Sequence, residues 1–204
     1  MNKLLANLAV LISLLTLSGC GSTLKVAEID SKTGYFATTH KVSHGGIVVN
    51  TKYNENKYSP MLYVKTDEKG KQYNTFFIDT FTKTKKFKKV VGKADLEKLV
   101  FEKGLASKVT SVSDVIGLHS LHKEIGDFLV VEPYVEWKGG YNFEAELKAL
   151  DPESGKVVYH VKNKAFNWDG LDQPLFFPMF NAFLDWTEGR TTQTEPKPEE
   201  KAEN

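Results

Sequence analysis

One residue of the chain carries a reactive thiol, since Cys20 is the only cysteine among the 204 residues. Histidines at helical spacing form a second candidate group, His119 with His122 and His40 with His44. Histidines three or four residues apart on a helix can share a metal ion, but no further thiol and no histidine–carboxylate signature accompanies these pairs. We therefore interpret them as surface or partly buried side chains, and we expect neither a metal nor another cofactor.

A pair of glutamates is the one candidate for acid–base chemistry. Glu132 and Glu136 have the same parity as Tyr134 on a predicted strand, so their carboxylates fall on one face. Glutamates on an edge strand more often keep that edge soluble. The sequence contains no nucleophile elbow, no phosphate-binding loop and no supported Ser–Lys dyad. We therefore expect a protein without enzyme activity.

The flanks of Cys20 indicate what its thiol does. A positive head ending at Lys3 precedes an apolar run over residues 4–17, shorter than the ~20 residues of a membrane-spanning helix. Such a run, ended by small residues, is typical of a secretory signal. The last residues of the run and the cysteine resemble the lipobox of bacterial lipoproteins at all four positions. By that resemblance residues 1–19 form a signal peptide and Cys20 receives acyl chains such as palmitate. The residues that the signal peptidase would recognise are Leu17, Ser18 and Gly19.

A lipidated Cys20 would hold the mature protein on a membrane. Each buried CH₂ contributes roughly 0.8 kcal/mol, and two or more acyl chains hold firmly where one does not. In the sorting pattern of Gram-negative lipoproteins, an aspartate after the cysteine retains the protein in the inner membrane, whereas Gly21 and Ser22 stand here. We therefore expect the periplasmic face of the outer membrane. Because the one thiol is used, a packed core and not a disulfide must stabilise the chain.

The charge balance limits the class of partner. The chain has 27 Lys and Arg against 26 Asp and Glu, and Lys3 is the only charged residue of the signal, so the mature chain carries 26 of each sign. A formally neutral protein has no field that attracts nucleic acid. We expect contacts with the membrane, through the lipid on Cys20, and with an envelope protein whose identity the sequence does not give. The oligomeric state is left open.

The chain after the signal divides into three predicted parts. Residues 20–59 mix turn signals with short β-prone pieces, and we interpret them as the lipidated N-terminus and a tether. Residues 60–188 form one periplasmic α/β domain. Residues 189–204 are polar and contain proline, and we expect them to be disordered.

Hydrophobic periodicity predicts the elements of the domain. Helices are expected over 73–84, 95–103 and 113–125, with a final helix that begins near Pro178; the β-branched threonines of 73–84 leave a strand as the alternative there. Strands are expected over 47–49, 61–66, 87–91, 127–137, 141–150 and 156–167. The fold class is α/β (α+β): one mixed, largely antiparallel sheet with helices packed on one face, a three-strand C-terminal ribbon and a final helix. 

The last two strands predict their own register. A five-residue turn over residues 151–155 would pair Leu150 with Lys156. That register places Leu147 opposite Tyr159 and Ala145 opposite Val161, so that apolar side chains share one face.

Four segments carry a resemblance that covers roughly residues 60–186. They are "FKKVV" at 87–91, "ADLEKLVFEKGL" at 94–105, "GDFLVV" at 126–131 and "LKALDPESGKVV" at 147–158. Together they resemble the periplasmic domain shared by penicillin-binding-protein activator lipoproteins, curli-secretion lipoproteins and the amino-terminal domain of the Tol-system propeller protein. Gly92 and Lys93 replace the arginine usual after the first motif.

That resemblance implies a non-catalytic lipoprotein that binds a protein partner in cell-envelope assembly or maintenance. Two alternatives stay open. One is a homo-oligomeric component of a secretion complex. The other is a carrier of a hydrophobic ligand, with the aromatic final helix as its pocket wall.

Two surfaces are candidates for the partner interface. Trp137 and Tyr141 flank a Lys-Gly-Gly hairpin tip, where aromatic side chains often stay exposed at contact sites. The basic run over residues 83–89 could meet anionic headgroups or an acidic partner, with Lys85, Lys86 and Phe87 at its centre. The alternative for this run is a solvated helix end whose lysines complement the helix dipole.

Overall fold

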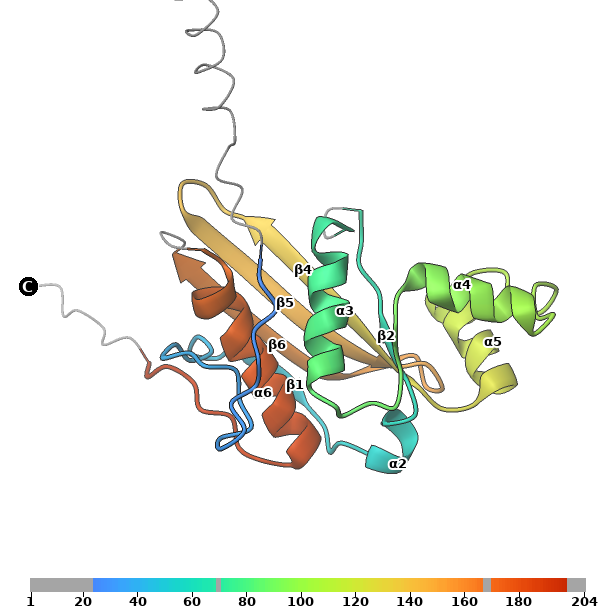
Figure 1. The fold of residues 1–204 in the computed structure, drawn as a ribbon, viewed down its shortest axis with the longest axis horizontal. Helices are drawn as coiled ribbons and strands as arrows, with labels where there is room; N and C mark the ends of the chain where they lie inside the picture. Colours follow the sequence, from blue (N-terminus) through green and yellow to red (C-terminus); the bar gives the residue numbers. More distant parts are fainter. Residues whose placement is uncertain (1–23, 69–70, 167–169, 198–204) are drawn as a thin grey trace, which may run out of the picture.

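The computed structural model describes residues 24–68, 71–166 and 170–197, and it confirms the expected α+β class (Figure 1). Six strands form one mixed sheet in the order β1-β6-β5-β4-β2-β3. Strands β4, β5 and β6 are the long antiparallel ribbon that the sequence predicts, whereas β2 and β3 are short and run parallel. The strands are β1 (Ile47–Asn50), β2 (Leu62–Val64), β3 (Val90–Val91), β4 (Leu129–Trp137), β5 (Asn142–Asp151) and β6 (Lys156–Phe166).

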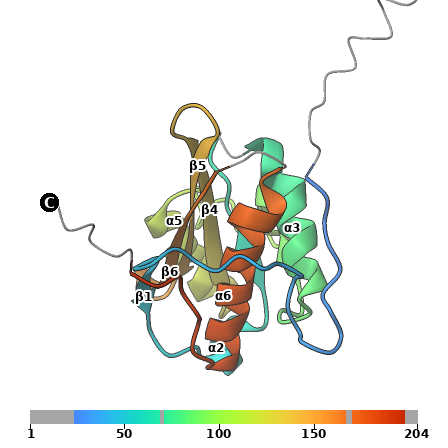
Figure 2. The ribbon, with the colours of Figure 1, turned by 90° about the vertical axis from the view of Figure 1, so that its left-hand side faces the viewer.

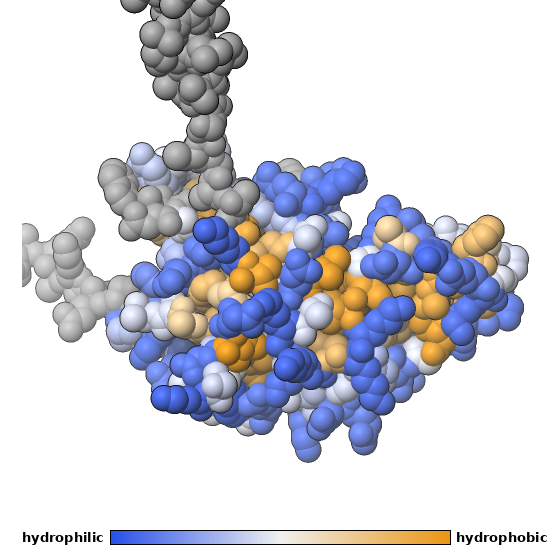
Figure 3. All heavy atoms as spheres, in the orientation of Figure 1, coloured by the Kyte–Doolittle hydropathy of each residue, from blue (hydrophilic) through white to orange (hydrophobic). Residues whose placement is uncertain are grey.

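Helices lie on both faces of this sheet and not on one face as expected (Figure 2). One face carries the main core beneath α3 and α6, and Figure 3 shows this side of the molecule, with hydrophobic residues visible among hydrophilic ones. The other face carries a smaller core at one end, beneath α4 and α5, because Tyr63, Val130 and Leu150 are apolar at positions that point away from the main core. The helices are α2 (Glu55–Tyr58), α3 (Asn74–Lys83), α4 (Lys93–Glu102), α5 (Val115–Ile125) and α6 (Phe177–Glu188), with single turns η1 (Lys71–Tyr73) and η2 (Asp172–Phe176).

Capping contacts define the start of α5 and the end of α4. The side chain of Asp114 accepts a hydrogen bond from the backbone N–H of Gly117 at 2.8 Å and so caps α5. Gly104, at φ +66°, stops α4, and the N–H of Leu105 then bonds back to the carbonyl of Val100 at 2.9 Å. These caps explain why α4 and α5 were predictable to within two residues.

The β5–β6 hairpin keeps its predicted faces but differs in register. Leu147 lies opposite Val161 and not Tyr159, and Ala145 lies opposite Asn163 and not Val161. Each pairing is shifted by two residues from the prediction. Because side chains alternate with a period of two, this shift leaves the apolar side chains on the same face.

The shift has two local causes. Asp151 pairs with Lys156, because its carboxylate accepts hydrogen bonds from the backbone N–H of Glu153 and from Nζ of Lys57, which hold it at the strand end and not in the turn. A β-bulge at Ala149–Leu150 supplies the rest of the shift. Lys57 lies on α2, so the sequence of the hairpin alone does not contain this contact.

Much of the segment expected to be a tether belongs to the folded domain. Phe36 and Val42 are buried in the main core, and Leu24 and Val26 pack against it. Strand β1 extends the sheet by pairing with β6. The folded domain therefore begins well before the predicted boundary at residue 60. Isolated apolar residues in a turn-rich segment have no periodicity, and this concealed their burial.

The start of the expected tail also lies against the domain. The guanidinium of Arg190 sits 4.4 Å from the ring centroid of Tyr35, and the N–H of Glu195 donates to the carbonyl of Val42 at 2.8 Å. Residues 198–204, the remainder of that tail, lie outside the described residues. Among the described residues, no helix is both long and apolar enough to cross a bilayer.

Candidate functional site

The two predicted interface surfaces lie at opposite ends of the sheet. Trp137 and Tyr141 belong to the β4–β5 hairpin, at the end where α3 begins (Figure 1). Lys85, Lys86 and Phe87 follow the end of α3, close to α2. The structure therefore does not bring the two groups together into one interface.

The hairpin surface is more extensive than predicted. Trp137 is 64% exposed and Tyr141 is 51% exposed, and Phe166 at the end of β6 joins them at 60%. The rings of Tyr141 and Phe166 have centroids 5.6 Å apart, and Nε1 of Trp137 donates to the carbonyl of Gly140 at 2.8 Å. We call Trp137, Tyr141 and Phe166 the aromatic tip. Sequence reasoning missed Phe166 because the strand pairing, and not the spacing along the chain, places it there.

The basic run is not a single exposed patch. Phe87 is buried and packs against Phe183, with ring centroids 6.2 Å apart, so it cannot anchor the protein to a surface. Lys86 forms an ion pair with Glu188 on α6. Lys85 is exposed, at φ +56°. The burial of Phe87 therefore favours the alternative of a solvated helix end.

The histidines have separate environments. His122 contacts Asp127 at 2.8 Å, and Nδ1 of His119 lies 3.2 Å from the carbonyl oxygen of Pro152. His40 and His44 are exposed on a loop. The described residues contain no group of three or more His, Cys, Asp or Glu side chains arranged to hold a metal ion.

The two glutamates considered for acid–base chemistry belong to different ion pairs. Glu132 contacts Nζ of Lys65 at 2.6 Å, and Glu136 contacts Nζ of Lys138 at 2.7 Å. Strand β2 pairs with β4 only as far as Val131, so β4 is an edge from that point. Pro133 has no N–H to offer there, and the charged neighbours keep this edge from pairing with other strands.

On the sheet face that carries α4 and α5, the part that these helices leave uncovered has a cluster of charges around Glu146. Its carboxylate contacts Nε2 of His160 at 2.9 Å, Nζ of Lys162 at 2.7 Å and Nζ of Lys148 at 3.1 Å. Burial alone would raise the pKa of Glu146, but these three hydrogen-bonding neighbours outweigh it and lower the pKa to about 2. Burial lowers the pKa of His160, so the lysines and not the histidine balance the carboxylate charge at neutral pH.

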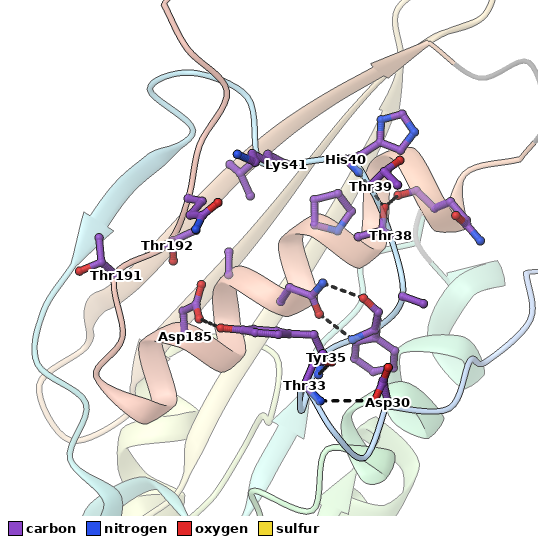
Figure 4. Close-up of a pocket in the computed structure, with 18 residues that line it drawn as sticks. Asp30, Thr33, Tyr35, Thr38, Thr39, His40, Lys41, Asp185, Thr191 and Thr192 are labelled. Carbon is purple, nitrogen blue, oxygen red and sulfur yellow. Dashed lines mark hydrogen bonds between the residues drawn. The ribbon is translucent and has the colours of Figure 1, made fainter.

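A groove that the sequence did not indicate lies beside α6 (Figure 4). Its volume is about 680 Å³, and its walls are the loop over residues 30–42, one side of α6 and the C-terminal segment over residues 191–193. The side chain of Asn181 fixes the loop to α6, because it accepts from the N–H of Phe36 at 2.8 Å and donates to the carbonyl of Phe36 at 2.9 Å. Tyr35 points across the groove and donates its hydroxyl hydrogen bond to Asp185 on α6 (Figure 4).

The groove has fixed polar groups on its floor and free ones on its rim. Burial raises the pKa of Tyr35 to about 12, helped by the hydrogen bond to Asp185, so the phenol stays neutral. Arg190 forms an ion pair with Asp185 at 3.2 Å. Hydroxyl and amide side chains around the rim make no hydrogen bond to any other residue that the structure describes. They are those of Thr39, Gln173, Thr191 and Gln193.

The groove leaves only a faint signal in the sequence. Pairs of threonines occur at 38–39 and at 191–192, both outside the predicted helices and strands. They are about 150 positions apart, so only the fold brings them to one site. The predicted lipidation site falls on residues outside the described part of the chain, namely Leu17, Ser18, Gly19 and Cys20.

No family model matches this chain, and no curated protein matches it. Some solved structures are similar to part of this chain. The C-terminal domain of LpoB from Escherichia coli is 13% identical and covers 54% of this chain and 85% of its own, with a TM-score of 0.39. Lipoprotein GNA1162 from Neisseria meningitidis is 13% identical and covers 64% and 94%, with a TM-score of 0.35. The PelC dodecamer from Paraburkholderia phytofirmans is 11% identical and covers 61% and 83%, with a TM-score of 0.35. We transfer no role from such distant similarities.

Proposed function

We propose that this protein is a non-catalytic lipoprotein, anchored through Cys20 at the periplasmic face of the outer membrane, that binds an extended segment of an envelope protein in the groove beside α6. The observation that carries the proposal is the open groove and its rim of hydroxyl and amide groups, which bond to no other residue within the described part of the chain. Unpaired hydroxyls and amides on extended chain segments can bond the backbone of a bound peptide. The groove is lined by one acidic side chain, Asp30, and one basic side chain, Lys41, so its ligand need not be strongly charged.

The titratable groups with shifted pKa values support a role without catalysis. The pKa of Lys57 is raised: burial opposes this, but hydrogen bonds to Asp151 and Glu153 outweigh it. Neighbours within the fold outweigh burial at Glu146 in the same way, whereas burial itself raises the pKa of Tyr35, helped by the hydrogen bond to Asp185. Each of these shifts has a structural partner that accounts for it, and none needs a substrate.

The alternative of a hydrophobic-ligand carrier has less support. Its predicted pocket wall, the aromatic side of α6, is packed into the core. The buried aromatic side chains of η2 and α6 are Phe176, Phe177, Phe180, Phe183 and Trp186. The third candidate, a homo-oligomeric component, is separated from the first by measuring the mass of the detergent-extracted protein.

Site-specific photo-crosslinking in intact envelopes tests the groove. A photoreactive residue at Thr39, on the rim, should give a discrete crosslinked protein, and Thr191→Trp should abolish it by filling the groove. The matched control is the same photoreactive residue at Thr110, an exposed threonine outside the groove. Equal crosslinks from both positions, or crosslinking at Thr39 that survives Thr191→Trp, would contradict the proposal.

A separate experiment tests the anchor. Mass spectrometry of the native protein should find a chain that begins at acylated Cys20, and globomycin should cause the unprocessed precursor to accumulate. Cys20→Ser should release the protein from membranes. A native protein that retains residues 1–19 would disprove the anchor without bearing on the groove.

A further inference from the structure

The chain enters the folded domain at the end that carries the aromatic tip. Leu24, the first described residue, lies near the beginning of α3, where Tyr73 and Phe76 line a shallow hollow with it. Figures 1 and 2 both show this point and the β4–β5 hairpin at the same end of the sheet. Cys20 is therefore joined to the same end of the molecule.

The connection between Cys20 and this end is short. Four residues of chain lead from Cys20 to Leu24, and an extended chain spans at most about 3.6 Å per residue, so their Cα atoms lie within about 14 Å of each other. The headgroup layer on each side of a bilayer is roughly 5–8 Å thick. With acyl chains on Cys20, this end of the domain is held close to the headgroups.

The side chains at this end suit the interfacial layer of a membrane. Tryptophan and tyrosine concentrate at that layer because each has an apolar body and a polar group. Their exposure here contrasts with the rest of the aromatic residues, most of which fill the main core. The tight turn passes through Gly139 and Gly140, at φ +96° and +58°, and these two residues between Lys138 and Tyr141 have no side chain.

The charges beside the aromatic tip compensate one another. Nζ of Lys138 contacts Glu136 at 2.7 Å and Glu144 at 3.8 Å, and Nζ of Lys164 contacts Glu144 at 4.0 Å. Two lysines thus face two glutamates. Attraction to anionic lipid is therefore not what brings this surface to a bilayer, and the aromatic side chains must supply the contact.

We propose that the aromatic tip rests in the interfacial layer of the bilayer that holds the acyl chains of Cys20, so that the domain stands on the membrane on its β4–β5 hairpin. The inference rests on the proposed lipid anchor. It leaves the groove beside α6 for the protein partner, and it replaces the earlier expectation that Trp137 and Tyr141 bind that partner.

Depth measurements with a nitroxide label test this orientation. Acylation occupies the sulfur of Cys20, so one introduced cysteine is the sole free thiol of the mature lipoprotein. Lys138→Cys places the label beside Trp137 of the tip, and Lys88→Cys places it next to the end of α2, because the N–H of Lys88 donates to the carbonyl of Ser59 at 2.9 Å. In phosphatidylcholine vesicles, collisions with oxygen relative to a water-soluble nickel chelate should rise several-fold at position 138 and stay at the aqueous value at position 88. Added phosphatidylglycerol should change neither reading.

A variant of the tip makes the outcomes distinct. Replacing all three tip residues by alanine should return the label at position 138 to the aqueous value, while circular dichroism and the mass of the acylated protein stay unchanged. If the protein is acylated but the label at position 138 gives the same aqueous value as the label at position 88, this inference is overturned and the anchor is left intact. If the label at position 138 is inaccessible to the nickel chelate in native envelopes but gives the aqueous value in protein-free vesicles, the tip contacts a protein partner. That result would also overturn this inference. Native protein without acyl chains would overturn both the anchor and this inference.

Discussion

Tyr159 and Trp186 stack face to face, with ring centroids 4.8 Å apart and ring planes inclined by 17°. Nε1 of Trp186 also donates to the carbonyl oxygen of Thr51 at 2.6 Å. One side chain of α6 thereby holds strand β6 and the segment that follows β1. Burial raises the pKa of Tyr159, so its phenol stays neutral within this contact.

Trp186→Ala should therefore destabilise the domain severely. The substitution removes a buried ring and a hydrogen bond, and we expect a loss of about 3–5 kcal/mol in the free energy of unfolding. Urea unfolding monitored by circular dichroism measures this loss. Trp137→Ala, which removes the same side chain from an exposed position, is the control, and it should cost about 1 kcal/mol or less. Similar losses in the two variants would contradict the assigned packing.

Phe36→Ala tests whether the N-terminal segment belongs to the domain. Phe36 is buried and stacks on Phe177 with ring centroids 5.5 Å apart, so its truncation should cost about 3–5 kcal/mol. Phe101→Ala is the matched control, because Phe101 is 82% exposed and should change stability by about 0.5 kcal/mol or less. If residues 20–59 acted as a tether, Phe36→Ala would leave the melting temperature unchanged.

Gly117→Ala should lower stability although alanine favours helices. A Cβ atom at position 117 would lie 2.0 Å from the carbonyl oxygen of Ser111, which forces the loop before α5 to move. Overpacking of this kind costs roughly 1–3 kcal/mol, more than the ~1 kcal/mol that alanine gains over glycine in a helix. Thermal unfolding measures the balance. Ile116→Ala, at a neighbouring position that is 80% exposed, should have little effect. A higher melting temperature for Gly117→Ala would contradict this prediction, because it would mean that the loop before α5 moves away from the new Cβ atom with little loss of free energy.

Glu146 should make stability depend on pH in the acid range. Its pKa is about 2 in the folded protein against an ordinary value of 4.5, so its contribution is complete above pH 4.5 and disappears as the pH falls toward 2. Glu146→Gln should cost up to about 3 kcal/mol at pH 7 and almost nothing at pH 2. Urea unfolding at several pH values measures the difference.

The matched control for this series is Glu102→Gln, which alters an exposed helical ion pair with Lys98. It should change the free energy of unfolding by about 0.5 kcal/mol or less at every pH. Burial lowers the pKa of His160 and its contact with Glu146 opposes that shift, so Glu146→Gln should lower the pKa of His160 further and add a loss of stability below pH 6.5 that Glu102→Gln does not show. A Glu146→Gln effect that persists at pH 2 would argue for lost packing and not for lost charge.

Hydrophobic periodicity predicted the elements whose structure is decided locally. The helices α4 and α5 have apolar stripes and capping residues of their own, and α6 begins at Phe177, one residue before the expected Pro178. The faces of β5 and β6 were also correct. Their register was not, because Lys57 on another segment helps to fix Asp151 at the strand end. No pattern within the hairpin encodes that contact.

The candidate surfaces could be predicted only in part. Trp137 and Tyr141 are exposed as expected, because they flank the Gly-Gly turn and therefore lie at the end of the sheet. Phe87 was a candidate for an exposed anchor and lies inside, because the turn after α3 directs it toward Phe183. The groove required Tyr35 and Asp185 to meet across 150 positions of chain, and tertiary contacts of that range have no signature in a single sequence.

The packing of Leu24 limits how far this domain could reach from the proposed anchor. If acyl groups hold Cys20 in the membrane, a domain that packs from the fourth following residue has too short a connection to search the envelope. The proposed partner would then have to be near the lipid headgroups before the two could meet. Recognition then becomes a search in two dimensions, in which lateral diffusion along the leaflet, and not reach across the compartment, sets how often they encounter each other.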